Sequence, residues 1–451
     1  MNTSHDNVCL GKALYKIAKR YGIAHKVGWV TCDNASNNRT MLQHFAQLLN
    51  TDETRKNHDK WDYQSRHIRC LAHIINLATQ AFIGTHSKAP HYDPSSTDSL
   101  DDSFNASPPL DFANRDEIGL VCCVTVKTCS SAKQKALFTD LQKKDSVEIP
   151  RALLIDMKYL NCFLVEISSE ESNVEGQRKL LALRITEEEW SRITELLALL
   201  KHADRAQQVF SSENKPCLSN GLPALEKLHM AWSSRTKKAK YAQFKPALDA
   251  GVRKIEEYYS KTSLADAYTM TMILDPNIKT HHFKKNWGQD LELDVRKEAE
   301  GIFQKRWEAT HRSSNVSTAA PLAPSGSQSR LHDDSSDDDE PLQAIPPSRP
   351  QNPWLKEFNS YLDGDDELDK SQSVVSWWGI NAQRYPTWAS LARDYLAIMA
   401  LSVSIEALQV LKSSLKKEVI FSTPLYTSIW ELENEVEADD GDSDWEDEVV
   451  T

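Results

Sequence analysis

The amino-acid sequence predicts an α/β protein whose ordered stretches are interrupted by polar and acidic segments. Near the start, an amphipathic pattern, a short run of strand-forming residues and a second amphipathic pattern follow one another. This helix, strand, helix order favours an α/β core. Beyond residue 118 the apolar residues recur mainly at helical spacing, and segments rich in Pro, Ser and Asp interrupt that periodicity.

Size and composition are those of a globular protein. The chain has 451 residues, of which 40% are hydrophobic, and this is enough for two or three domains with apolar cores. A mean hydropathy of −0.54 and the lack of an unbroken apolar run of about 18 residues exclude an ordinary membrane span. We see no secretory signal at the start, and eight scattered cysteines are typical of reduced intracellular thiols. We therefore expect an intracellular protein without a membrane partner.

The net charge of −12 is concentrated in two acidic segments. Residues 431–451 hold eleven carboxylates and no Lys or Arg, and residues 332–340 hold six more carboxylates, so the remainder of the chain is net positive. Acidic runs of this kind usually remain solvated and disordered. The alternative is that they bind a basic partner such as a histone-like tail.

The first ordered segment, residues 1–84, begins with a predicted helix. Leu10, Leu14, Ile17 and Tyr21 form its apolar face, and Gly22 is a candidate C-terminal cap.

Two strands and two further helices are predicted in the same segment. Residues 26–32 are rich in strand formers and end abruptly at Asp33, and a helix with an apolar face at residues 41–49 follows. Residues 67–70 are compatible with a second short strand. The apolar spacing of residues 71–82 predicts a helix directly after it.

The middle of the chain is expected to be helical. Residues 85–117 form an insert of Ser, Asp, Pro and His that is long enough for us to expect disorder. Residues 118–309 are predicted to be mainly helical. One helix in this region begins with a capping box, because Thr186 lies three residues before Glu189.

The remaining residues divide into three parts. Residues 310–352 are interpreted as an acidic linker rich in Pro and Ser. Residues 353–430 are expected to be ordered and to include a helix that begins behind Pro386. Residues 431–451 are expected to form a disordered acidic tail.

Asp33 is a candidate catalytic carboxylate, because a charge at the end of a strand lies at the edge of an α/β sheet. Metal-assisted phosphoryl transfer needs two or three such carboxylates from different segments, since Mg²⁺ prefers oxygen ligands and paired metal ions stabilise both the attacking and the leaving oxygen. A single aspartate does not make a site. The alternative is that Asp33 belongs to a turn or caps a helix.

Cys70 and His73 have a Cys-x-x-His spacing that could supply two of the four ligands of a zinc ion. No second pair follows at the spacing of a zinc finger. We therefore predict no convincing zinc site, and interpret these residues as packing residues.

A basic cluster interleaved with aromatic residues is a candidate DNA contact, because cations bind phosphate and aromatic rings stack on bases. A plain solvated helix face is the alternative interpretation. The cluster consists of Arg235, Lys237, Lys238 and Lys240, with Trp232, Tyr241 and Phe244 around them.

Large aromatic side chains are concentrated after residue 374. Such side chains contribute roughly 1.5 to 3 kcal/mol each when fully buried, and they dominate interface energetics. They could therefore form a subunit or domain interface, or they could pack in the core of the chain itself. They are Trp377, Trp378, Tyr385 and Trp388, with Pro386 between them.

The order of these motifs resembles that of a known family. Residues 28–38 (Gly-Trp-Val-Thr-Cys-Asp-Asn-Ala-Ser-Asn-Asn) and residues 69–77 (Arg-Cys-Leu-Ala-His-Ile-Ile-Asn-Leu) resemble the central core of hAT superfamily (hobo/Activator-type) transposases. Further segments are similar to the family's helical region and to its carboxy-terminal dimerisation segment. They are residues 258–259, 267–268 and 274–279 for the helical region, and 376–378, 384–386, 391–396 and 402–406 for the dimerisation segment.

The resemblance implies a ribonuclease-H-like core interrupted by a large, mostly helical insertion, with DNA cleavage by a metal-binding Asp, Asp, Glu triad. Asp33 matches the second acid of the triad and Glu406 the third, and both would bind Mg²⁺ if the protein were active. Cys70 and His73 match the Cys-x-x-His beside the family's active site. The dimerisation residues implied in this way are Trp377, Trp378, Tyr385, Pro386, Trp388, Leu391 and Tyr395.

Several features depart from the family pattern. The first acid normally lies on an earlier strand, which we expect this chain to lack, together with the amino-terminal zinc finger. Asp156 is not followed by the usual Arg-Trp pair, and Ala407 replaces the usual Arg after Glu406. We therefore interpret the chain as truncated at its amino terminus and partly degenerate.

Three functional hypotheses follow. The first is a nuclear, non-catalytic, transposase-derived protein that forms a homodimer or higher oligomer through residues 353–430, with DNA as a candidate partner. The second is an active DNA transposase whose first Asp lies in a missing upstream segment. The third is an interaction scaffold with an acidic tail.

Overall fold

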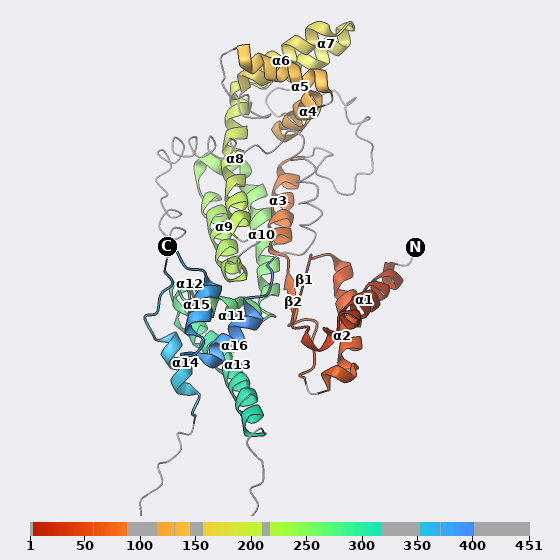
Figure 1. The fold of residues 1–451 in the computed structure, drawn as a ribbon. Helices are drawn as coiled ribbons and strands as arrows, with labels where there is room; N and C mark the ends of the chain where they lie inside the picture. The colour runs from red at the N-terminus through yellow and green to blue at the C-terminus, as the bar shows by residue number, and fades with distance from the viewer. Residues whose placement is uncertain are drawn as a thin grey trace, which may run out of the picture. The chain divides into compact units, whose positions relative to one another are not determined.

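The computed structural model describes eight stretches of the chain, which divide into two units (Figure 1). Unit 1 contains the described residues up to Ala265 together with Met399 and Ala400, and unit 2 contains those from Asp266 to Ile398. Unit 2 is therefore inserted into the sequence of unit 1. The described stretches are residues 3–56, 58–87, 115–129, 131–144, 157–209, 217–316, 352–369 and 371–400.

A parallel pair of short strands lies in unit 1. β1 (Val30–Cys32) pairs with β2 (His67–Arg69), with Thr31 opposite Ile68. Parallel strands need a crossover, and α2 (Ser36–Asn50) lies in the connection between them. Both predicted strands are present. The first begins later than predicted, because residues 24–26 form the 3-10 turn η1 (Ala24–Lys26).

Helix α1 (Thr3–Arg20) packs against α2. The predicted cap at Gly22 is confirmed, since Gly22 has a φ of 64° and its amide donates to the carbonyl of Lys19 at 2.9 Å. Gly11 allows close approach of the two helices, because a Cβ atom there would lie 2.7 Å from the carbonyl oxygen of Met41. The core beneath them consists of Ala18, Ala24, Leu42, Phe45, Ala46, Leu49 and Trp61.

Four helices form the main helical layer of unit 1, in which α10 packs against α3 and α9, and α8 against α9 (Figure 1). Trp232 connects them, since its Nε1 donates to the carbonyl of Leu199 at 2.9 Å. A Cβ atom at Gly251 would come within 2.5 Å of the same indole ring, so glycine is needed for this packing. The helices are α3 (Leu71–His86), α8 (Glu187–Val209), α9 (Gly221–Arg235) and α10 (Lys245–Thr262), with the short turns η6 (Leu218–Asn220) and η7 (Ala239–Phe244). The turn η2 (Glu53–Arg55) instead follows α2 and packs against η1.

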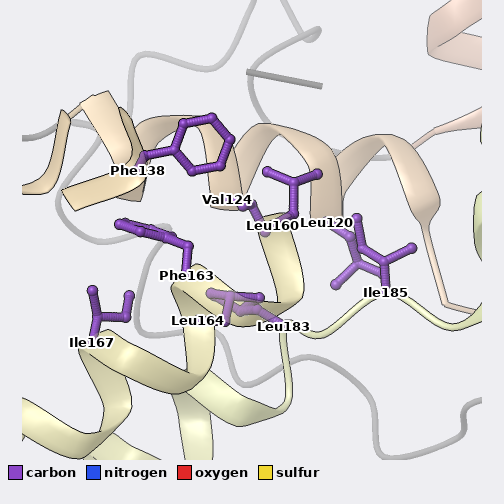
Figure 2. Close-up of a cluster of buried hydrophobic side chains, with 9 residues drawn as sticks. All are labelled: Leu120, Val124, Phe138, Leu160, Phe163, Leu164, Ile167, Leu183 and Ile185. Carbon is purple, nitrogen blue, oxygen red and sulfur yellow. The ribbon is translucent and has the colours of Figure 1, made fainter. Parts of the chain in front are cut away.

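A second apolar core of unit 1 lies among α4 (Glu117–Cys129), α5 (Ala132–Lys144), α6 (Met157–Glu170) and α7 (Val174–Leu181). Figure 2 shows Phe138 beside Phe163 at its centre, with ring centroids 5.8 Å apart. The cluster consists of Leu120, Val124, Phe138, Leu160, Phe163, Leu164, Ile167, Leu183 and Ile185.

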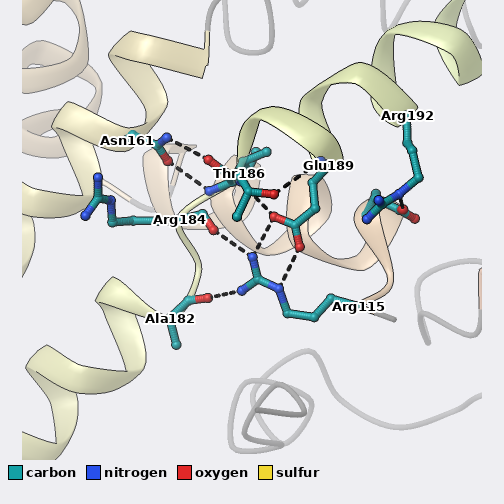
Figure 3. A network of polar contacts seen from close by, with 9 residues as sticks. Arg115, Asn161, Ala182, Arg184, Thr186, Glu189 and Arg192 are labelled. Atoms are coloured by element: carbon teal, nitrogen blue, oxygen red, sulfur yellow. Dashed lines mark hydrogen bonds and ion pairs between the residues drawn. The ribbon is translucent and has the colours of Figure 1, made fainter. Parts of the chain in front are cut away.

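A buried ion pair stabilises the start of α8 (Figure 3). Arg115 donates to both carboxylate oxygens of Glu189, at 2.7 and 2.6 Å, and to the carbonyls of Ala182 and Arg184. The predicted capping box is confirmed, because the amide of Thr186 donates to Glu189 and the amide of Glu189 donates to Oγ1 of Thr186. Burial alone would raise the pKa of Glu189, but the hydrogen bonds from Arg115 and Thr186 and the charge of Arg115 together outweigh it and lower the pKa.

Unit 2 is helical around an aromatic core. The predicted helix behind Pro386 is confirmed, and proline occupies its first turn. The elements are α11 (Ala267–Ile273), α12 (His281–Asn286), α13 (Gln289–Val316), α14 (Leu355–Leu362), α15 (Val374–Asn381) and α16 (Pro386–Tyr395). Its buried rings include Phe303, Trp354, Phe358, Tyr361, Trp377, Trp378, Tyr385, Trp388 and Tyr395.

A two-stranded parallel sheet fits an α/β core, and the ribonuclease-H-like arrangement of that core stays a prediction. Most of the expected insert at residues 85–117 and most of the expected linker at residues 310–352 lie outside the described residues, as do residues 401–451 with Glu406 and the acidic tail. No helix that the structure describes combines the length and the apolar character that a membrane-spanning segment needs.

Candidate functional site

Asp33 lies directly after β1 and opens the turn into α2. Its Oδ1 accepts hydrogen bonds from the amide of Ala35, at 3.0 Å, and from the side-chain amide of Asn38. This is the turn geometry that short acidic residues favour before a helix. The side chain is half-buried. Asp33 therefore follows a strand, as predicted, and also forms the turn that was the alternative interpretation.

The chain that leaves unit 2 is bound next to this strand end. Oγ1 of Thr31 donates to the carbonyl of Met399 at 2.8 Å, and the amide of Leu71 donates to the carbonyl of Ala400 at 3.2 Å. The side chain of Cys70 does not cap the start of α3. The carbonyl of Ala400 therefore accepts from one of the first amides of that helix, which have no acceptor within the helix itself.

Glu406 follows Ala400 by six residues in the sequence. Six residues span at most about 20 Å even when fully extended. Glu406 itself lies outside the described residues.

The two strands bring Cys32 and His67 together. Sγ of Cys32 lies 3.1 Å from Nε2 of His67. Burial is the main cause that raises the pKa of the Cys32 thiol to about 12 and lowers the pKa of His67 to about 4. Both groups are therefore neutral near pH 7, and they form a hydrogen bond rather than a thiolate–imidazolium pair. Sequence inspection missed this contact, because it depends on the pairing of two distant segments.

Cys70 and His73 lie at the start of α3. Cys70 is buried and His73 is half-buried. After burial and the charge of Asp33, the proximity of Cys70 contributes least to raising the pKa of the Cys32 thiol. Within the described ranges, no three His, Cys, Asp or Glu side chains gather in a way that could hold a metal ion.

The described residues around Asp33 do not by themselves fit Mg²⁺. They offer one carboxylate, a neutral thiol and a neutral imidazole. The guanidinium of Arg69 is also close, at 3.5 Å from Oδ1 of Asn34, and it lowers the pKa of both Cys32 and His67. Hard cations prefer several oxygen ligands and are repelled by a nearby positive charge. We derive no catalytic step from this arrangement.

The aromatic part of the candidate DNA contact is not on the surface. Trp232, Tyr241 and Phe244 are each at most 1% exposed, so their rings cannot stack on bases. Arg235 is 8% exposed, and its Nη1 donates to the carbonyl of Ala231 within the last turn of α9. The spacing of the aromatic residues therefore reflects core packing, and DNA contact by Arg235, Lys237, Lys238 and Lys240 stays a prediction.

The lysines of the cluster do reach the solvent. Lys237 and Lys240 are exposed and Lys238 is half-buried, in the connection between α9 and α10. The ammonium of Lys240 lies 5.6 Å from the ring centroid of Tyr241. Phosphate contact by these lysines stays a prediction.

The aromatic residues assigned to dimerisation pack in the core of unit 2, one of the two interpretations left open. Nε1 of Trp378 donates to the carbonyl of Leu274 at 2.8 Å, and the hydroxyl of Tyr385 donates to Asp366 at 2.6 Å. Tyr395 donates in the same way to Asp266 at 2.8 Å. Trp377, Trp388 and Leu391 are also buried, whereas Pro386 is exposed at the start of α16.

Lys279 was not recognised as a structural residue from the sequence. It is 1% exposed and has a φ of 43°, which is unusual for a residue other than glycine. Its Nζ donates to the carbonyl of Gly364 at 2.6 Å and lies 5.1 Å from the ring centroid of Tyr361. Lys279 therefore joins the turn after α11 to the loop after α14.

Comparison with known proteins finds a similarity in the carboxy-terminal part of the chain. Residues 357–420 match the model of the hAT family C-terminal dimerisation region. The chain is also 23% identical, over 96% of its length, to the putative transcriptional regulator tpeD of Talaromyces stipitatus, and it spans about half (50%) of that relative. The carboxy-terminal part of the chain is therefore similar to the hAT family. The matched region begins in unit 2 and continues past its end at Ile398.

Proposed function

We propose that this protein is derived from a transposase, does not cleave DNA on its own, and self-associates through the carboxy-terminal segment at residues 353–430. The observation that carries the proposal is the match of residues 357–420 to the hAT dimerisation region. We further propose that the protein acts in the nucleus and contacts DNA. The description of the relative tpeD as a putative transcriptional regulator supports a DNA-associated role.

The surroundings of Asp33 support the non-catalytic part. Two-metal phosphoryl transfer depends on several converging carboxylates, and the described residues supply one carboxylate next to Arg69. Each 1.36 kcal/mol of lost transition-state stabilisation lowers the rate tenfold, so a site short of one bridging carboxylate would turn over orders of magnitude more slowly. The pair Asp33 and Glu406 is, in this proposal, the remnant of a Mg²⁺ site.

One observation favours the alternative of an active transposase. The hydrogen bonds of Thr31 and Leu71 to residues 399–400 keep the chain leading to Glu406 next to the strand that ends at Asp33. A third carboxylate from elsewhere would then complete the triad. Incubation with plasmid DNA and Mg²⁺ or Mn²⁺ separates the two proposals. Nicking by the wild-type protein that is lost in Asp33→Ala would overturn the non-catalytic proposal.

DNA contact is proposed for the α9–α10 connection. Between Arg235 and Lys245 the sequence contains Lys237, Lys238 and Lys240 and no acidic residue. Contacts of this kind bind phosphate without base specificity and release counterions, so the affinity falls as salt rises.

Fluorescence anisotropy with a labelled duplex tests this contact across a range of salt concentrations. We expect the triple variant Lys237→Glu, Lys238→Glu, Lys240→Glu to bind weakly, with a slope of log K against log salt that is smaller by about 2 to 3. The variant Lys12→Glu, Lys16→Glu, Arg20→Glu carries the same charge change on exposed positions of α1 and serves as control. Equal losses in both variants would show a non-local charge effect and argue against this site.

A further inference from the structure

Helix α15 has no charged residue on any side. Its sequence from Val374 to Asn381 is Val-Val-Ser-Trp-Trp-Gly-Ile-Asn. A helix that is apolar all round is normally buried all round. Here Trp377 and Trp378 are buried in the aromatic core of unit 2, at 4% and 5% exposure, whereas Val375 is 57% exposed and Ile380 is 71% exposed.

The exposed residues of α15 share one side of the helix. With about 100° between successive residues, Val375, Ser376, Gly379 and Ile380 fall within an arc of about 140°, and both tryptophans lie outside it. A Cβ atom added at Gly379 would meet no atom within 4 Å, so the middle of this arc is open. We call these four residues the α15 outer face.

This face differs from the rest of the matched region. Among the described residues of the hAT dimerisation match, the large apolar side chains that are exposed are Val375, Ile380 and Met399. Trp378, Tyr385 and Tyr395 of the same region donate their side-chain hydrogen bonds within unit 2. The surface available for a partner in this part of unit 2 is therefore the α15 outer face, and not the aromatic cluster.

We propose that the α15 outer face binds the same face of a second copy of this chain. The proposal rests on the self-association proposed above, and it names the contact surface. The match of the surrounding residues to a dimerisation region selects a second copy as the occupant. In a two-fold dimer both copies contribute the same patch of residues to the interface. Gly379 has no side chain, so the two α15 helices can approach closely. The uncharged arc forms the apolar centre that such interfaces have.

The buried tryptophans then act indirectly. They hold α15 with its outer face toward the solvent, and they do not touch the second copy. A substitution of Trp377 or Trp378 would weaken dimerisation by disturbing the core of unit 2, so it cannot locate the interface. Substitutions on the outer face can do so, because the monomer has room for them.

The test is sedimentation equilibrium of the full chain, in which a dimer has about twice the monomer mass of 51.1 kDa. We expect Gly379→Arg and Ile380→Asp each to raise the dimer dissociation constant at least tenfold. Leu293→Asp is the matched control, because Leu293 is 53% exposed on α13 of the same unit, and it should leave the constant unchanged. Near-UV circular dichroism of the aromatic core checks that each variant is folded, and Ile380→Thr replaces any variant that is not.

The possible outcomes separate the two proposals. A wild-type protein that stays monomeric at high concentration would overturn self-association itself. A wild-type dimer that persists in Gly379→Arg and Ile380→Asp would overturn the α15 outer face and leave self-association in place through another surface. An equal loss in Leu293→Asp would likewise overturn the assignment to α15.

Discussion

Thr31 donates a side-chain hydrogen bond to the carbonyl oxygen of Met399, across 368 positions of the sequence. Two residues later β1 has ended and Asp33 begins the turn into α2. The contact therefore attaches the chain that leaves unit 2 to the strand carrying the predicted catalytic acid. The nearby hydrogen bond from Leu71 to Ala400 has the same effect at the start of α3.

Removal of this hydroxyl should loosen the attachment. Thr31→Val keeps the strand propensity of the position but deletes the donor, and we expect a loss of about 0.5 to 1.5 kcal/mol in unfolding free energy. Hydrogen exchange should quicken at the amide of Leu71, which is bonded to Ala400. Thr85→Val is the control, since Thr85 bonds only within its own helix, to Ala81. Unchanged exchange at Leu71 would show that the contact does not hold residues 399–400.

The buried pair of Arg115 and Glu189 should be important for the stability of unit 1. Arg115→Met removes the positive charge that balances the buried carboxylate of Glu189. Breaking a buried ion pair in this way lowers the free energy of unfolding by about 3 to 5 kcal/mol. Urea denaturation followed by circular dichroism measures the change. Lys133→Met removes a cation from the exposed pair with Glu170 and should cost no more than about 1 kcal/mol. If both variants lost a similar amount of unfolding free energy, burial would not be what makes the Arg115–Glu189 pair more important than the exposed pair.

Acid should destabilise unit 1 through Glu117. Burial raises the pKa of this carboxyl, but hydrogen bonds from His86 and Arg192 outweigh it and lower the pKa to about 2. Because the folded pKa lies below the ordinary value of 4.5 for a glutamate, the stabilisation is present above about pH 4.5 and is lost as the pH falls toward 2. The contribution is about 3 kcal/mol at most. In Glu117→Gln, the unfolding free energy should depend less steeply on pH between about 4.5 and 2. An unchanged slope would contradict the stabilising role of the Glu117 carboxylate.

Cys32 should react slowly with thiol reagents. Its raised pKa of about 12 leaves almost no thiolate near pH 8, and the thiolate is the reactive form. Alkylation followed by peptide mass spectrometry should label Cys9 and Cys162, which are exposed, at least about 100-fold faster. Labelling of Cys32 at a comparable rate in the folded protein would mean that its thiol is not held neutral beside His67.

Local features of the fold were predictable because they depend on neighbouring residues. The cap at Gly22, the capping box of Thr186 and Glu189, and the helix behind Pro386 each follow from a few adjacent positions, and each is present. The break after Ile273 likewise agrees with the proline at position 276.

Contacts between distant segments were not predictable from the sequence. The pairing of Cys32 with His67 requires the register of β1 and β2, and the bond between Thr31 and Met399 requires the path of the chain after unit 2. The DNA contact illustrates the same difficulty. Trp232 and Arg235 precede the lysines at positions 237–240, but the direction in which each side chain points is set by helices that pack from elsewhere in the chain.

The aromatic core of unit 2 has a practical consequence for recombinant work. Phe303 on α13 packs against Phe358 and Trp388, with ring centroids 5.4 and 4.8 Å apart, yet it lies more than fifty residues before the family match begins at residue 357. A fragment cut at the borders of the match would lack this ring and expose the others, which favours aggregation. A fragment that starts at Asp266 keeps every aromatic partner together, and is the better starting point for solution studies of this region.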